Sequence, residues 1–497
     1  MPENKTRKQD ILNAMVIGFA LFATFFGAGN LIFPPSLGES AGKNWVPGFI
    51  TYVIADAGVA VAAVLSAIKT GGGMEGMLGK LGRIPARVLS IILMLLLGPL
   101  LTVPRTGATT YEMSVAPQMP GLSPWIFSVI FFGLVALLTV RPAAVVDIIG
   151  KFLTPVLLIT LIGLCVKGIV SPLGEPAESQ IPGAEVRVGL TLGYQTLDAL
   201  IAAPLCLIIA RNVQDKGYRD RRSVARMISY SSLIAFEGLF VVYAGLSYLG
   251  ATVSGQHMMD ISGTELMVEI TRQLLARAGT VLLGVIVLLA CLTTAIGTTS
   301  AVSDYLSGVT KNKVSYTAFV LITCAAGVLL SNLGTARIIT LAEPVLTLLY
   351  PVFLTQVFLN FFAEKIRTPW VFRGAAIGAA VYGGLYILPN YFGVDSDLLL
   401  ELITAVPLAD LGLGWLLPAV VGGIVGAFIR PKKNSGDGEK AADQGGENVT
   451  KEPSPCHERS GYGECGEEAG SDGSRGVCGA GGSCAWGGAG DPVLFQL

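Results

Sequence analysis

The sequence is divided by long apolar runs, and their length limits the folds open to the chain. A membrane-spanning helix needs about 20 mostly apolar residues, because each residue adds ~1.5 Å toward crossing a hydrocarbon core of ~30 Å. Twelve such runs are centred near Ala23, Asp56, Leu95, Phe132, Leu157, Leu200, Ala235, Leu289, Ile322, Leu349, Ala380 and Val420. Only 14% of the residues are charged, against about 25% in soluble domains. The sequence therefore predicts an all-α polytopic membrane protein with about twelve transmembrane helices.

Positive charge in the loops predicts how the chain is oriented. Lys5, Arg7 and Lys8 precede the first run, and the loops after every second run are also basic. Lys and Arg are retained on the cytoplasmic side of a membrane, so both termini are expected in the cytoplasm. One outer loop contains residues 262–278, whose apolar spacing predicts a short amphipathic helix on the membrane surface.

The composition changes after residue 430. Gly, Ser, Glu, Asp and Lys dominate there, and such a segment cannot bury enough apolar area to offset the entropy of ordering it. We therefore divide the chain into a transmembrane transporter domain, residues 1–430, and a disordered cytoplasmic tail, residues 431–497. The last seven residues resemble part of a protease recognition site, so part of the tail could be non-native.

The first apolar run contains a helix-breaking segment at residues 22–35. Gly27, Gly29 and Asn30 are poor helix formers. Pro34 and Pro35 remove two backbone donors and are expected to end the segment. Unpaired N–H and C=O groups at membrane depth are costly unless a ligand, an ion or trapped water takes them. The break is therefore a candidate binding site, and a glycine kink for close helix packing is the alternative.

The sixth run contains an ionisable residue, Asp198, with Pro204 shortly after it. A charge at the bilayer centre costs about 2.5–3.5 kcal/mol on insertion scales, which indicates a second interrupted helix. If runs one to five and six to ten are related by a pseudo-two-fold axis in the membrane plane, the two breaks correspond, as they do around midplane sites of secondary transporters. The alternative is a conventional helix in which Asp198 pairs with another intramembrane group such as Arg105.

Two adjacent threonines, Thr293 and Thr294, lie at mid-depth of the eighth run. Their hydroxyl oxygens suit a hard cation such as sodium, which prefers oxygen ligands. Alternatively, each hydroxyl donates to a carbonyl one turn earlier in its own helix. Asp56, Glu237 and Glu343 are interpreted either as structural partners of other buried groups or as coupling residues.

The sequence gives no indication of an enzyme. Its two histidines lie in a loop and in the tail, and no Walker A motif or Ser-His-Asp arrangement falls on a plausible soluble domain. We therefore expect neither a catalytic site nor a cofactor, and no nucleic-acid partner. An ATP-driven pump is disfavoured because no sizeable soluble domain is present.

Four motifs give the chain a family resemblance. They are Gly27-Ala-Gly-Asn-Leu-Ile-Phe-Pro-Pro35, Gly98-Pro-Leu-Leu-Thr-Val-Pro-Arg-Thr106, Ala290-Cys-Leu-Thr-Thr-Ala-Ile-Gly297 and Ser331-Asn-Leu-Gly334. In order and spacing they resemble the bacterial branched-chain amino acid carriers (LIVCS, BrnQ-type), over about residues 10–430. The resemblance implies sodium-coupled import of leucine, isoleucine and valine across the bacterial cytoplasmic membrane. It also implies the LeuT-like five-plus-five inverted repeat of the amino acid–polyamine–organocation superfamily, with helices one and six broken.

The resemblance implies a substrate site between the two breaks. The backbone N–H groups of Ala28 and Gly29 would take the substrate carboxylate, with Asn30 beside them. The second break would take the substrate ammonium, and the residues there are Gln195, Thr196 and Asp198. Asp198 stands where the distant relatives have a neutral residue, so the carboxylate itself could pair with the ammonium.

The resemblance also implies a sodium site between spans one and eight. Its ligands would be the carbonyl oxygens of Ala23, Phe26 and Ala290 and the hydroxyls of Thr293 and Thr294. The coupling ion would then lie next to the break that takes the substrate.

Rival functions remain open from the sequence. A proton-coupled or uncoupled amino acid exchanger would use Asp198 or Glu237 to carry the proton. A channel would line a continuous pore with the helix breaks, and a non-transporting nutrient sensor would signal through the tail.

Overall fold

The computed structural model describes residues 7–71, 73–140, 154–256, 261–394 and 397–429, and within these ranges the chain is helical without a β-strand. All of them belong to one compact unit, Met1–Arg430. The tail predicted for residues 431–497 lies outside the described residues, so its disorder stays a prediction.

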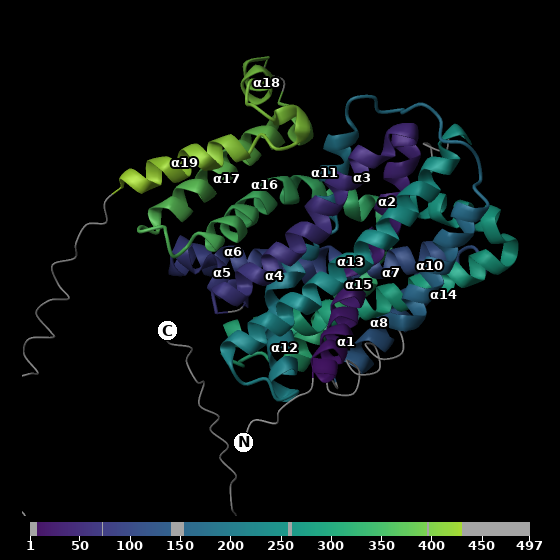
Figure 1. The fold of residues 1–497 in the computed structure, drawn as a ribbon, viewed down its shortest axis with the longest axis horizontal. Helices are drawn as coiled ribbons and strands as arrows, with labels where there is room; N and C mark the ends of the chain where they lie inside the picture. The colour runs from purple at the N-terminus through teal and green to yellow at the C-terminus, as the bar shows by residue number, and fades with distance from the viewer. Residues whose placement is uncertain (1–6, 72, 141–153, 257–260, 395–396, 430–497) are drawn as a thin grey trace, which may run out of the picture. The chain divides into compact units, whose positions relative to one another are not determined.

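Every predicted apolar run falls on a helix or a pair of helices (Figure 1). In chain order these are α1 (Arg7–Phe25) with α2 (Ala28–Ala41), α3 (Trp45–Val53) with α4 (Val59–Lys69), α6 (Arg83–Leu95) with α7 (Thr102–Thr110), α8 (Pro124–Thr139), α10 (Thr154–Val170), α11 (Glu185–Gln195) with α12 (Asp198–Asp215), α13 (Arg221–Val253), α14 (Gly263–Val309), α15 (Tyr316–Ser331), α16 (Thr335–Phe361), α17 (Trp370–Phe392) and α19 (Leu416–Phe428). The short helices α5 (Gly73–Leu78) and α18 (Asp397–Thr404) lie between them.

By length and apolarity, seven helical stretches of the described chain could cross a membrane, and four shorter apolar helices accompany them. The all-α membrane architecture is therefore confirmed. The exact number of twelve spans stays a prediction, because the shorter helices and α1 do not meet the same length and apolarity criteria.

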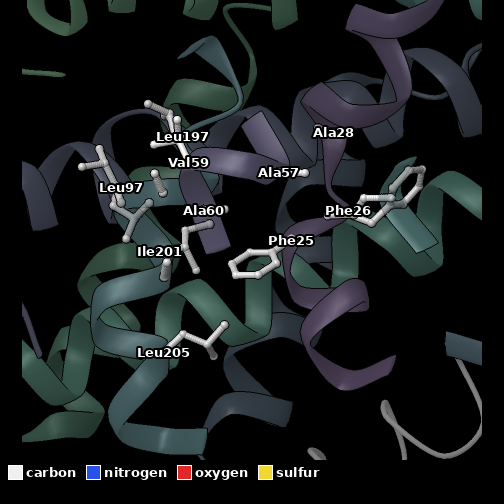
Figure 2. Close-up of a cluster of buried hydrophobic side chains, with 14 of the residues drawn as sticks. Phe25, Phe26, Ala28, Ala57, Val59, Ala60, Leu97, Leu197, Ile201 and Leu205 are labelled. Atoms are coloured by element: carbon white, nitrogen blue, oxygen red, sulfur yellow. The ribbon is translucent and has the colours of Figure 1, made fainter. Parts of the chain in front are cut away.

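The first span is broken where the sequence predicts it. Helix α1 ends at Phe25 and α2 begins at Ala28, and Gly27 between them is extended, with φ −119° and ψ −160°. Figure 2 shows Phe25 and Phe26 pointing to opposite sides of the chain at this break. The ring of Phe26 stacks on that of Phe22, with 5.3 Å between the centroids. Packing on both sides thus holds the non-helical backbone in place.

The expectation that Pro34 and Pro35 end this segment is wrong. Both lie inside α2, which continues to Ala41. A proline ring fixes φ near the helical value, and membrane helices tolerate proline where neighbouring helices pack against it. Helix α13 supplies that packing, because the Gly250 backbone lies against the Pro35 carbonyl.

The sixth span is also broken, between α11 and α12. Leu197 adopts a left-handed conformation, with φ 72° and ψ 11°, immediately before α12 begins at Asp198. A bulky residue rarely adopts this conformation, so burial must hold it there. Figure 2 shows Leu197 and Ile201 in one hydrophobic cluster with Val59, Ala60 and Leu97. The chain therefore breaks before Asp198, and Pro204 lies inside α12.

Spans two and three each contain π-helical turns. One, Ile54–Gly58, contains Asp56 and lies between α3 and α4. Another, Leu96–Leu100, contains Pro99 and lies between α6 and α7. A π turn shifts the direction of the side chains that follow it and often lies at a functional site. Pro99 thus lies in a π-helical turn that separates the two α-helices of span three.

The helix predicted over residues 262–278 is present as the first part of α14. Ser262 caps its N-terminus, and non-helical dihedral angles at Ala276 separate it from the rest of α14. Its apolar face does not lie on the membrane surface as expected, because Leu266, Ile270 and Leu274 are buried in the protein core. The amphipathic spacing therefore reflects packing against the protein.

Helix α2 approaches α13 so closely that their backbones touch. A Cβ atom added at Gly250 would lie 2.0 Å from the Pro35 carbonyl oxygen, and one added at Gly38 would lie 1.8 Å from the Ser247 carbonyl oxygen. Small residues allow this kind of close approach between membrane helices. Close glycine packing and a break in the helix therefore coexist in the first span.

We predict that Gly250→Ala destabilises the protein. The added methyl group has to push two backbones apart, and overpacking of this kind costs about 1–3 kcal/mol. The apparent Tm of the purified protein in detergent should fall below that of the parent. Gly384→Ala on α17 is the matched control, because no atom lies within 4 Å of the added Cβ. Equal Tm values for the two variants would contradict the close α2–α13 contact.

Candidate functional site

Two hydroxyls of α14 meet the backbone where α1 ends. Thr293 Oγ1 lies 2.8 Å from the Ala290 carbonyl oxygen and 3.3 Å from that of Ala23. Thr294 Oγ1 lies 3.4 Å from the carbonyl oxygens of both Thr24 and Phe26. A hydroxyl has one hydrogen, so neither threonine can bond both of its carbonyl neighbours. Each threonine therefore leaves one neighbouring carbonyl oxygen without its hydrogen.

Each of the five groups that the resemblance implied for sodium thus contacts another of them: Thr293 lies near the Ala23 and Ala290 carbonyl oxygens, and Thr294 lies near that of Phe26. Thr293 does donate within its own helix, as the alternative interpretation required, but Thr294 reaches across to α1. Thr24, whose carbonyl oxygen also approaches Thr294, was not foreseen. Gly27 permits the approach, because a Cβ there would lie 3.1 Å from Thr294 Oγ1. Neutral carbonyl and hydroxyl oxygens of this kind suit a hard cation such as sodium.

Asn30 connects the first break to the second. Its Nδ2 lies 2.9 Å from Asp198 Oδ2 and 3.3 Å from Asp56 Oδ2, and it also contacts the hydroxyl of Tyr243. Its Oδ1 accepts the Gly27 N–H at 3.3 Å. All of these side chains are buried. An amide nitrogen carries two hydrogens, so three acceptors compete for two donors. The network is rich in acceptors and can accommodate an additional donor group.

Thr196, at the second break, extends this network. Its hydroxyl lies 2.7 Å from Asp56 Oδ1 and also 2.7 Å from the Gly193 carbonyl oxygen. Asp56, which the sequence left as either a structural or a coupling residue, therefore lies in the same cluster as Asp198. Glu237 is exposed on α13 and Glu343 accepts a hydrogen bond from Gln195 Nε2 at 2.9 Å, so the described contacts place neither of them in this cluster.

Arg105 of α7 occupies the carbonyl end of α11. Its Nη1 donates to the Gln195 carbonyl at 2.7 Å and its Nη2 to the Thr196 carbonyl at 3.1 Å. These carbonyls lack helical partners because α11 ends there. Asp198 takes a hydrogen bond from Asn30, so the conventional helix with an Asp198–Arg105 pair is not what the structure contains. The resemblance placed the substrate ammonium beside these carbonyls, and a guanidinium lies there instead.

A small cavity lies between the two breaks. Its volume is only about 10 Å³, room for about one water molecule, and its lining includes Ala28, Asn30, Arg105, Thr196, Asp198 and Thr294. A second, mostly apolar cavity of similar size, about 10 Å³, is lined by Leu101, Leu197, Ile338, Ile339, Ala342 and Leu346 together with Arg105 and Gln195. Arg105 therefore contributes to both cavities, one polar and one apolar.

Of the substrate-site residues taken from the resemblance, the structure brings Ala28, Asn30, Thr196 and Asp198 around the polar cavity. The backbone of Gly29 lies beside Arg105, and the side chain of Gln195 points to Glu343. Sequence reasoning did not assign Tyr243 or Arg105 to the site. A tyrosine and an arginine within apolar runs are a signal of buried polar contacts, but the runs alone do not say which helices meet.

The fold is similar to that of solved transporters. Mhp1, a nucleobase-cation-symport-1 family transporter solved in a closed conformation with bromovinylhydantoin, is similar with a TM-score of 0.54 and 14% identity, over 83% of this chain and 91% of Mhp1. A Na⁺-coupled sialic acid symporter is similar with a TM-score of 0.53 and 14% identity, over 84% of this chain and 90% of the symporter. The LeuT-like fold with broken helices one and six is thereby confirmed.

The sequence comparisons give the family. Residues 10–433 match the family described as "Branched-chain amino acid transport protein". The branched-chain amino acid permease BraB of Bacillus subtilis is 32% identical over 85% of this chain and 97% of BraB. The branched-chain amino acid transport system 2 carrier protein of Pseudomonas aeruginosa is 34% identical over 82% of this chain and 93% of that carrier. The chain belongs to this family and is a multi-pass membrane carrier, not an enzyme.

Proposed function

We propose that the protein is a sodium-coupled symporter that imports leucine, isoleucine and valine by alternating access. It would lie in the bacterial cytoplasmic membrane with both termini in the cytoplasm. The observation that carries this proposal is the approach of Thr293 and Thr294 to the carbonyl oxygens at the end of α1, next to the polar cavity.

The charge of the buried cluster supports a coupling cation. With both carboxyls ionised, Asp56, Asp198 and Arg105 carry a net formal charge of minus one. Buried charge is unfavourable unless it is compensated, and a zwitterionic amino acid brings no net charge. One sodium ion among the Ala23, Phe26, Ala290, Thr293 and Thr294 oxygens would balance the cluster. It would also bridge spans one and eight and stabilise the outward-open state.

The acceptor-rich network supports an ammonium group as the second ligand. An ammonium has three hydrogens to donate, and Asp198, Asp56 and Asn30 offer more acceptors than their own donors satisfy. The carboxylate of the same molecule would take the free N–H groups of Ala28 and Gly29 in the first turn of α2. In this orientation the ammonium and the carboxylate of an α-amino acid would lie at opposite sides of the polar cavity.

The apolar cavity beside Arg105 would take the aliphatic side chain. Its walls are leucine, isoleucine and alanine side chains from α7, α12 and α16 and their flanking turns. One methylene in a hydrophobic pocket changes affinity by only about 1–3 kcal/mol. Leucine, isoleucine and valine would therefore compete for the same pocket.

A proton-coupled or uncoupled exchanger is the second candidate, and one observation favours it. Asp56 and Asp198 both approach the same Asn30 nitrogen, so the two carboxylates lie close together. Two neighbouring carboxylates favour retention of one proton between them. A proton held there would neutralise the cluster without sodium.

The two candidates are separated by leucine uptake into proteoliposomes. We expect accumulation of radiolabelled leucine when a sodium gradient is imposed, and its loss when choline replaces sodium at fixed pH. A proton gradient alone should drive little uptake. Accumulation that follows the proton gradient and ignores sodium would replace the first candidate with the second.

Thr294→Ala should weaken the sodium site. The hydroxyl that faces the Thr24 and Phe26 carbonyls is removed, so the sodium concentration for half-maximal leucine uptake should rise about tenfold, in proportion to the loss of ~1.4 kcal/mol of binding free energy. Protein level should change much less. Ser307→Ala is the matched control, because its hydroxyl donates to Asp304 of the same helix. Identical sodium curves for Thr294→Ala and the parent would remove this residue from the ion site.

Ala342→Leu should alter substrate preference. Ala342 is buried in the wall of the apolar cavity, so the larger side chain takes space that leucine needs more than valine does. The ratio of the apparent affinity for leucine to that for valine should fall about tenfold, which is the size of effect expected for one to two methylene groups. Ala336→Leu is the control, because Ala336 is exposed on the same helix. An unchanged preference would show that the side chain binds elsewhere.

A further inference from the structure

Arg105 has N–H donors that its two contacts with the α11 carbonyls leave unused. The side chain is only 6% exposed, and its Nε has no hydrogen-bond partner among the described residues. A guanidinium carries five N–H groups, of which one on Nη1 and one on Nη2 donate to the α11 carbonyls. A buried charged donor without a partner is unfavourable. The edge formed by Nε and Nη2 is therefore free for a ligand.

This free edge lies beside the N-terminus of α2. A Cβ atom added at Gly29 would lie 3.1 Å from Arg105 Nη2, so the guanidinium is against the first turn of that helix. The first N–H groups of a helix have no intrahelical partner, and this end carries partial positive charge. A full and a partial positive charge thus meet at one place, which favours an anion.

Thr102 adds a second unpaired donor. Its hydroxyl has no hydrogen-bond partner in the described part of the chain, and the side chain is 3% exposed. Thr102 and Arg105 both line the polar cavity, together with Ala28. Unpaired donors gathered around one cavity indicate that a ligand with acceptor atoms completes them.

We propose that Arg105 binds the carboxylate of the transported amino acid side-on, through Nε and Nη2. This inference rests on the proposed function and deepens it, because it adds a side-chain ligand to the backbone N–H groups of Ala28 and Gly29. The two carbonyl contacts at the end of α11 remain in place and fix the guanidinium plane. Bidentate pairing of a guanidinium with a carboxylate is both strong and specific in direction.

The proposal sets the orientation and the class of substrate. The carboxylate lies at Arg105 and the α2 N-terminus, and the ammonium lies at Asp198, on the Asn30 side of the same cavity. A free carboxylate is then required. Leucinol, in which a neutral alcohol replaces the carboxylate, would leave the guanidinium edge unpaired.

The test compares leucine with leucinol as competitors of radiolabelled leucine uptake in proteoliposomes. In the parent, leucinol should compete at least about 100-fold more weakly, because sites built around a hydrogen-bonded group reject analogues that lack it. In Arg105→Gln the affinity for leucine should fall. The ratio of the leucinol to the leucine concentration needed for half-maximal competition should then drop to a few-fold. Arg105→Lys should lie between them, because it keeps the charge and loses the planar fork.

Thr109→Val on α7 is the matched control. Its hydroxyl contacts Thr335 at 3.1 Å, so its loss removes a buried contact without touching the guanidinium, and the ratio should equal that of the parent. If Arg105→Gln lowers uptake and Tm but keeps the parental ratio, Arg105 only caps α11 and the proposal is overturned. A parent that shows no leucine uptake would instead remove the proposed function, before any variant is compared.

Should Arg105→Gln fail to fold, Gly29→Ala carries the same test. Its added Cβ would come within 3.1 Å of Nη2 and 2.9 Å of the Phe33 ring, so the guanidinium edge has to shift. The apparent affinity for leucine should fall about tenfold while that for leucinol changes little, since each tenfold step is ~1.4 kcal/mol of pairing. Equal changes for both compounds would overturn the proposal.

Discussion

The structure depends on how two gaps in helical hydrogen bonding are filled inside the membrane-spanning domain. Lipid offers no partner for a free N–H or C=O group. At the first gap, Asn30 accepts the Gly27 N–H, and at the second, Arg105 donates to the Gln195 and Thr196 carbonyls. A nearby side chain therefore stabilises the first break, and a side chain about ninety residues earlier in the chain stabilises the second. Arg105 and Thr102, each with an unpaired donor among the described residues, line one small cavity, which is why we place the substrate there.

The same contacts connect the proposed ion and substrate sites. Phe26 and Asn30 lie on either side of Gly27, one offering a carbonyl toward Thr294 and the other an amide toward Asp198. A movement of α2 relative to α14 would change both sites together. The negative formal charge of the cluster also makes cation binding and substrate binding mutually favourable in our proposal. Coupling then follows from one short stretch of non-helical backbone.

Local signals in the sequence predicted most of the fold. The length of the apolar runs located the helices. Gly27, Gly29 and Asn30 located the first break, because the low helix propensity of a residue affects only the few residues around it. The same reasoning was wrong for Pro34 and Pro35, which α13 holds within a continuous helix, and for residues 262–278, whose apolar face packs on protein. In both cases a neighbouring helix overrode the local preference, and the sequence alone does not show that neighbour.

The sequence by itself determined that this chain is a multi-span helical membrane protein with interruptions in spans one and six. These properties follow from hydrophobic length and backbone propensity, which are read along the chain. The tertiary structure alone decided that Asp56, Asp198, Tyr243 and Arg105 meet around Asn30 and Thr196. Such meetings depend on which helix faces contact one another, and that choice is made by packing between segments that lie from 26 to 213 residues apart in the chain.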